Sequence, residues 1–270
     1  MSAILYPDYD VVFVNSFNRL SGGSTNFSIN VTQQLRPNNE YDSVVVSSGS
    51  CPKSWYSINE YNYQFTLTEG KSSVTVSIPQ QSYTAQSLAT QLTTTLTAAS
   101  PNLYTYTVTI NANTAKFTYT VSSGNSSFTF SNNSPWRAMG FNIGTVTFSA
   151  STLTSANVVN MNFTNVIYVL LDCILNQNNI LCVLRPNQSA DFSSYTYFAG
   201  GSEPFIIRPL TKANQVLNFS LISDRGLPID LNGLDWELQL IFFKSNDYYK
   251  KLIQDKQLEL LQRNVSELKQ

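Results

Sequence analysis

The sequence contains no histidine, the residue that enzymes use most often as a general acid or base. Ser–His and Cys–His nucleophilic couples and the usual histidine ligands of catalytic zinc are therefore excluded. Asp and Glu together number 17, so a glycosidase that needs only two carboxylates stays open, but none of them forms a recognisable pair signature. We expect no enzymatic activity, no catalytic residue and no cofactor, and keep a hydrolase as the third-ranked hypothesis.

The densest group of oxygen ligands lies in residues 224–235, which include Asp224, Asp230 and Asp235. Calcium binding is one interpretation, although the spacing is not that of the standard calcium loop, which needs further acidic positions and a terminal Glu. The other interpretation is a pair of turns, since Asn232-Gly233 is typical of hairpins. We favour the turns and predict no metal site.

The cysteines Cys51, Cys173 and Cys182 have no CxxC spacing that would indicate zinc or redox chemistry. We predict buried free thiols. A bond between Cys173 and Cys182 would require the two residues to face each other on adjacent strands, and that alternative stays open.

Several aromatic residues lie near predicted loops and could stack on sugar rings: Trp55, Tyr56, Tyr195 and Tyr197. With 15 Tyr and 16 Phe in the chain, most aromatic side chains are expected in a core or an interface. Gly22-Gly23 and Gly200-Gly201 lack the strand-to-helix context of phosphate-binding loops and are predicted to be loops.

Charged residues make up only 12% of the chain, whereas aromatic residues reach 13%. The formal net charge of -1 provides no basic field for a phosphate backbone, so nucleic acid is not an expected ligand. Weak charge repulsion favours association between copies. No apolar run reaches the length of a membrane span.

Alternation of apolar and polar residues predicts strands along most of the chain, separated by turns such as Ser48-Gly49-Ser50. Residues 63–78 read as a hairpin, followed by a helix that Thr84 caps and that places Leu88, Leu92 and Leu96 on one face. Three further strands in a meander and a short helix starting at Pro135 complete a unit at 61–150. Residues 1–60 and 151–245 supply about eight other strands, the number in a jelly-roll β-sandwich.

The last segment, 246–270, changes to Lys, Gln, Glu and Leu. Its apolar residues recur at helical spacing, which predicts an amphipathic helix with an interaction face formed by Leu258, Leu261, Val265 and Leu268. Because the heptad fails at Lys251 and Gln254, a surface helix docked on its own or a neighbouring subunit is favoured over a coiled coil.

Several segments, in this order and spacing, resemble the minor capsid (penton) proteins of virophages and polinton-like viruses. They are the segments 59–65 (NEYNYQF), 74–79 (VTVSIP) with Ser82-Tyr83, the helix with Leu88, the pair Lys116-Phe117, 136–141 (WRAMGF) and 224–240. The resemblance implies a mainly β fold, a single jelly roll with an inserted α+β domain. The C-terminal helix is not part of the family pattern, and no catalytic or metal-binding residue is carried over.

The resemblance also implies a structural function, as a homopentamer that fills the vertices of an icosahedral virion assembled inside the infected host cell. Its expected partners are further copies of itself, double jelly-roll trimers of a major capsid protein, and other minor capsid proteins. The alternative is a carbohydrate- or receptor-binding β-sandwich, such as a virion fibre head or a lectin.

Overall fold

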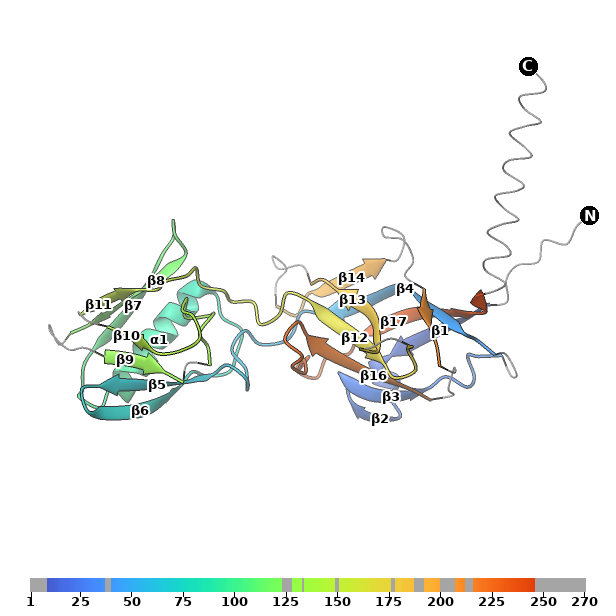
Figure 1. The fold of residues 1–270 in the computed structure, drawn as a ribbon, viewed down its shortest axis with the longest axis horizontal. Helices are drawn as coiled ribbons and strands as arrows, with labels where there is room; N and C mark the ends of the chain where they lie inside the picture. The colour runs from blue at the N-terminus through green and yellow to red at the C-terminus, as the bar shows by residue number, and fades with distance from the viewer. Residues whose placement is uncertain are drawn as a thin grey trace, which may run out of the picture. The chain divides into compact units, whose positions relative to one another are not determined.

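The computed structural model describes residues 9–36, 40–122, 128–132, 134–148, 151–175, 178–186, 192–199, 207–211 and 216–245. They form two compact units, which we describe separately (Figure 1). One unit is Trp55–Phe163, which begins before and ends after the range 61–150 expected from the sequence. The other combines the described residues up to Ser54 with those from Thr164 onward. No described helix is long and apolar enough to cross a membrane.

The discontinuous unit contains two antiparallel sheets. The first has the order β1-β17-β4-β14, with β15 also paired to β4; the strands are β1 (Tyr9–Asn15), β17 (Glu237–Phe243), β4 (Ser43–Pro52), β14 (Tyr195–Ala199) and β15 (Arg208–Pro209). The second has the order β13-β12-β16-β3-β2; the strands are β13 (Ile180–Leu184), β12 (Ile167–Leu171), β16 (Val216–Ser223), β3 (Asn26–Asn30) and β2 (Ser21–Gly23).

These sheets form a jelly roll. Apart from the short strands β2 and β15, the described residues supply eight strands, four in each sheet, all paired antiparallel. The apolar residues predicted to alternate in the sequence, such as Val12, Val14, Phe27 and Ile29, point into the core and are buried. Trp236 is also buried in this core, and its indole N–H donates to the Ser24 carbonyl at 2.7 Å. The predicted jelly-roll fold is confirmed.

The unit Trp55–Phe163 has a four-stranded sheet, β10-β9-β5-β6, and a three-stranded sheet, β11-β8-β7. Its strands are β5 (Gln64–Glu69), β6 (Ser72–Ser77), β7 (Tyr106–Asn111), β8 (Lys116–Val121), β9 (Phe128–Ser131), β10 (Val146–Thr147) and β11 (Thr152–Thr154). The helix α1 (Ala85–Ala99) is capped by Thr84 and buries Leu88, Leu92 and Leu96, as predicted; Thr84 forms a capping box with Ser87.

Helix α1 also covers one edge of the three-stranded sheet. The hydroxyl of Thr93 accepts a hydrogen bond from the Val108 N–H at 2.8 Å, and the hydroxyl of Thr97 accepts one from the Tyr106 N–H at 3.0 Å. Since Thr93 and Thr97 are four residues apart, they lie on the same side of the helix, where they satisfy backbone groups of the edge strand β7.

Three local predictions differ from the structure. Strand β9 pairs with β5 and β10 instead of extending the β7–β8 hairpin into a meander. The segment after Ser134 is a series of turns, closed by a Phe141 N–H bond to the Trp136 carbonyl, and not a helix. The predicted turn around Gly49 lies inside β4, because Gly49 lets Leu238 of β17 approach the strand closely.

Candidate assembly surface

The predicted interaction face of the C-terminal segment, Leu258, Leu261, Val265 and Leu268, lies outside the described residues. The chain is described as far as Ser245, just beyond β17. There the N–H and hydroxyl of Ser245 donate to the Asp42 carboxylate at 2.8 and 2.9 Å. Burial of Asp42 acts to raise its pKa, but these hydrogen bonds outweigh burial and hold the pKa below its usual value.

The acidic residues of the segment 224–235 serve as turn and anchor residues. The Asp230 carboxylate accepts the N–H of Asn232, and Asp235 accepts the Ser16 hydroxyl at 2.7 Å. Asn232 and Gly233 both have positive φ, 51° and 80°, as a tight turn of this type requires. The predicted turns are therefore confirmed. The turn at Asn232-Gly233 links β16 to β17, which lie in different sheets, so it does not form a hairpin. Within the described residues no three His, Cys, Asp or Glu side chains gather to hold a metal ion.

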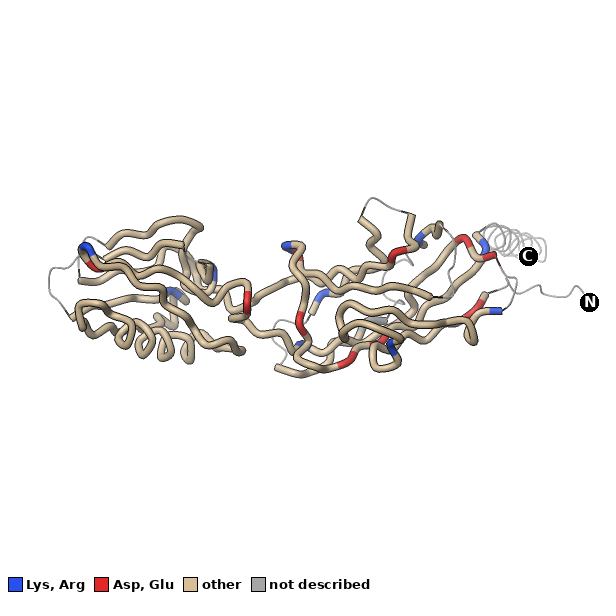
Figure 2. Tube along the Cα trace, turned by 90° about the horizontal axis from the view of Figure 1, so that it is seen from below, with Lys and Arg blue, Asp and Glu red and all other residues tan. Residues whose placement is uncertain are grey.

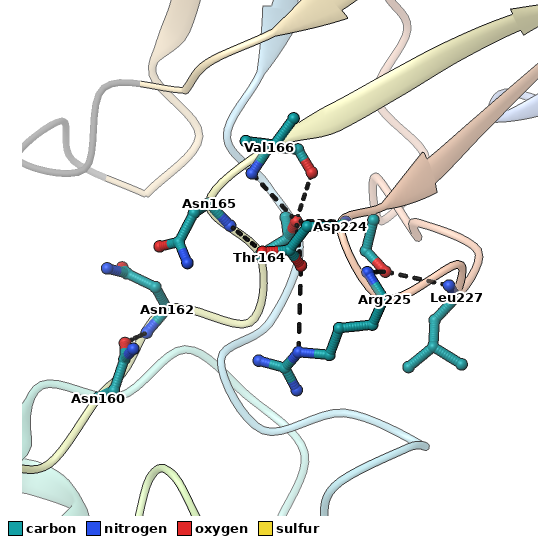
Figure 3. Close-up of polar contacts among 9 residues, drawn as sticks. Asn160, Asn162, Thr164, Asn165, Val166, Asp224, Arg225 and Leu227 are labelled. Atoms are coloured by element: carbon teal, nitrogen blue, oxygen red, sulfur yellow. Dashed lines mark hydrogen bonds and ion pairs between the residues drawn. The ribbon is translucent and has the colours of Figure 1, made fainter. Parts of the chain in front are cut away.

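Both chain crossings between the two units are anchored on this same segment. At the first crossing the Ser54 hydroxyl donates to the Leu231 carbonyl at 2.7 Å, and the Asn232 side chain donates to the Ser54 carbonyl. At the second crossing, Figure 3 shows Thr164 beside Asp224. The Thr164 hydroxyl donates to the Val166 carbonyl at 2.5 Å and accepts the Asp224 N–H at 3.3 Å.

All three cysteines are free and buried, as predicted. Cys182 of β13 is paired with Val169 of β12, and Cys173 lies in the turn beyond that strand. Burial raises the pKa of Cys51 and of Cys182 to about 12 and that of Cys173 to about 11, so all three stay protonated and unreactive at neutral pH.

One side of the jelly roll exposes large apolar side chains. We call it the β1 flank and define it by Tyr9, Phe13, Phe17 and Leu20. Their exposed fractions are 46% for Tyr9, 62% for Phe13, 75% for Phe17 and 65% for Leu20. These residues follow the chain along β1, the 3-10 turn Ser16–Asn18 and the approach to β2, so the β1 flank joins the edge strands of both sheets.

Side chains cap the backbone of β1 along its outer edge. The Gln34 side chain accepts the Phe13 N–H at 2.6 Å and donates to the Phe13 carbonyl at 3.1 Å. The Arg36 guanidinium donates to the Tyr9 carbonyl at 2.6 Å and is held by Asp10 through an Nε–Oδ1 contact of 2.7 Å. Because these backbone groups are already bonded, the edge is not open to pairing with a further strand at these positions.

The opposite side of the jelly roll ends in β14 and β15. We call it the β14 flank and define it by Leu175, Tyr195 and Tyr197. Tyr197 is 81% exposed, and Leu175, whose N–H donates to the Pro209 carbonyl of β15 at 2.8 Å, is also exposed. The candidate sugar-stacking residues therefore differ in exposure. Tyr195 and Tyr197 face solvent, Trp55 is buried and Tyr56 is half-buried.

Sequence reasoning did not single out the β1 flank. The feature of the sequence that marks this flank is an aromatic residue at a position of the strand where a polar residue is expected, because Phe13 lies between the buried Val12 and Val14. Charged residues are few along the described chain and are separated by long uncharged stretches, as Figure 2 shows. In Trp55–Phe163 the charged residues are Glu60, Glu69, Lys71, Lys116 and Arg137.

Comparison with known proteins gives a likeness of fold. No protein-family model and no curated protein matches the sequence. Among solved structures, the crystal structure of the selenomethionine-labelled mavirus penton protein is similar, with a TM-score of 0.53 and 11% sequence identity. The match covers 87% of this chain and 99% of that chain, so it includes most of both units. The chain therefore shares its mainly β, jelly-roll fold with a penton protein.

Proposed function

We propose that this chain is a non-enzymatic structural protein of a viral capsid, and that five copies form the vertex capsomer of an icosahedral virion. The likeness of fold over 87% of the chain to a penton protein supports the capsid role. The observation that carries the proposal is the pair of exposed apolar flanks on opposite sides of one jelly roll. Grouped apolar side chains of this kind often mark a protein–protein contact, and a subunit of an assembly buries them there.

The proposal includes the partners expected from the sequence. A vertex capsomer contacts the surrounding double jelly-roll trimers of a major capsid protein and other minor capsid proteins, and it is located in the virion after assembly in the infected host cell. The unit Trp55–Phe163, with few charged side chains, would project outward or contact these neighbours. The predicted face Leu258, Leu261, Val265 and Leu268 is proposed as a further subunit contact.

The direct test is an image of the purified protein in which its rotational symmetry is counted. Fivefold rings support the proposal, and their mass should be five times the monomer mass of 30.1 kDa. A protein that stays monomeric at high concentration, measured by sedimentation velocity, contradicts it.

The second candidate function is recognition of a carbohydrate or receptor. It is favoured by Tyr195 and Tyr197, exposed aromatic side chains on neighbouring positions of one face of β14. A glycan array tests it directly. Binding by the wild type that Tyr197→Ala abolishes would favour a lectin-like head, and the matched control is Phe13→Ala on the other flank.

A further inference from the structure

We infer that the β1 flank of one copy packs against the β14 flank of the next copy, head to tail, through side chains and not through strand addition. The inference rests on the proposed capsid function and assigns the surfaces that would build its ring. A closed ring needs two different patches on each subunit, because a patch that pairs with itself gives only dimers.

The two flanks have the placement that such a ring requires. In the sheet order β1-β17-β4-β14, strand β1 is one edge and β14 the other, and β15 lies on the β14 side of β4. The second sheet likewise ends in β2 on one side and β13 on the other. Each copy therefore offers Phe13 and Phe17 at one edge and Tyr195 and Tyr197 at the opposite edge.

The exposed apolar area of the β1 flank approaches that used by a standard protein contact. With about 200 Å² for a complete aromatic side chain, the exposed fractions of Tyr9, Phe13 and Phe17 correspond to about 350 Å² of ring surface. A standard interface buries about 800 Å² per partner, somewhat more than half of it apolar. Three residues thus account for most of the apolar area that a standard contact uses.

The paired charges and the bonded backbone of the β1 flank favour another copy of this chain as the partner that packs on it. The charges beside the β1 flank are already paired, Arg19 with Asp235 at 3.3 Å and Arg36 with Asp10 at 2.7 Å. A partner therefore needs no opposite charge, and the aromatic β14 flank has none to offer at Tyr195 or Tyr197. Since Gln34 and Arg36 occupy backbone groups at the edge of β1, contact by side chains is the remaining mode there.

The test places charge on one flank at a time in the full chain. One variant carries Phe13→Glu and Phe17→Glu, and another carries Tyr195→Glu and Tyr197→Glu. All four side chains are exposed, so both variants should keep the wild-type circular dichroism and melting temperature. The control is Ile143→Glu, at an exposed apolar residue of the other unit, which should keep the wild-type ring. If either double variant melts early, the corresponding Ser substitutions replace it.

Mass photometry and chemical crosslinking give the outcomes. We expect each double variant to be monomeric and an equimolar mixture of the two to crosslink as a dimer, because each variant retains the flank that the other lacks. Rings that persist in both double variants overturn the assignment of flanks and leave the capsid function standing. Monomeric variants whose mixture gives no dimer overturn the head-to-tail contact, and a monomeric wild type refutes the capsid proposal itself.

Discussion

Replacing Glu69 by Ala should destabilise the unit Trp55–Phe163 by about 3 kcal/mol. Glu69 ends β5, is only 1% exposed and has no cationic partner among its described contacts. Its carboxylate accepts the Tyr106 hydroxyl at 2.6 Å, the Ser100 hydroxyl at 2.8 Å and the Asn102 N–H at 3.0 Å. The carboxylate thus fixes the connection between α1 and β7.

The magnitude follows from the donors that the substitution leaves without an acceptor. A buried donor without a partner costs about 1–3 kcal/mol. Tyr106 and Ser100 are buried and would each bear that cost, whereas Asn102 is exposed and can bond to water. Because the substitution also removes a buried acidic group, part of this cost is recovered, and the expected decrease in unfolding free energy is about 3 kcal/mol. Glu69→Gln retains one acceptor oxygen and should cost about half as much.

Urea unfolding followed by hydrogen-exchange mass spectrometry measures this change, because peptides from Trp55–Phe163 report that unit separately. The matched control is Glu60→Ala, an exposed carboxylate of the same unit. In a double-mutant cycle, Glu69→Ala and Tyr106→Phe should be coupled by at least about 1 kcal/mol. A loss below about 0.5 kcal/mol for Glu69→Ala, or additive effects in the cycle, would show that the carboxylate does not hold this network.

Three further predictions concern stability. Although burial acts to raise the pKa of Asp10, hydrogen bonds hold it below the ordinary value. The ionised Asp10 should therefore stabilise the fold fully above about pH 4 and less as the pH drops further. Asp10→Asn should remove this part of the acid dependence of the unfolding free energy. Gly49→Ala should cost about 1–3 kcal/mol in urea titrations, since its Cβ would lie 2.7 Å from the Glu237 backbone oxygen as well as 2.4 Å from Leu238 Cδ2. Gly23→Ala, with open space around it, should be nearly neutral. Burial raises the pKa of Tyr119 and of the three thiols above their usual values, so stability should be constant up to about pH 9 and decline at higher pH, when these groups ionise in the unfolded chain alone; a flat unfolding free energy to pH 12 contradicts this.

Local elements were predictable because their signals are local. The hairpin β5–β6 follows from alternation around the Gly70 turn, and α1 follows from the Thr84 cap and the spacing of its leucines. The turn series after Ser134 shows the limit of such signals. Pro135 and Gly140 match the two ends of a helix, but so short a segment does not repay the cost of nucleation, and turns satisfy its backbone instead.

Pairings between distant segments could not be read in the same way. Strand β9 pairs with β5, about 60 residues earlier, and no residue in either strand specifies that partner. The place of the β1 flank at one side of the sandwich depends on the same information, because β1 is an edge strand only if it pairs with β17 and with no second strand. The glycine that permits the close approach of Leu238 looks like a turn until its neighbour is known.

The anchoring of Ser54 and Thr164 on one segment has a consequence for the modularity of the protein. Both points where the chain leaves and rejoins the jelly roll are fixed by the jelly roll's own residues 224–232. The hydrogen bonds that hold these two points thus come from residues of the sandwich itself. A host sandwich built in this way can accept a different module at the same junction, so that lineages could exchange what lies between Ser54 and Thr164 while keeping the shell-forming part unchanged.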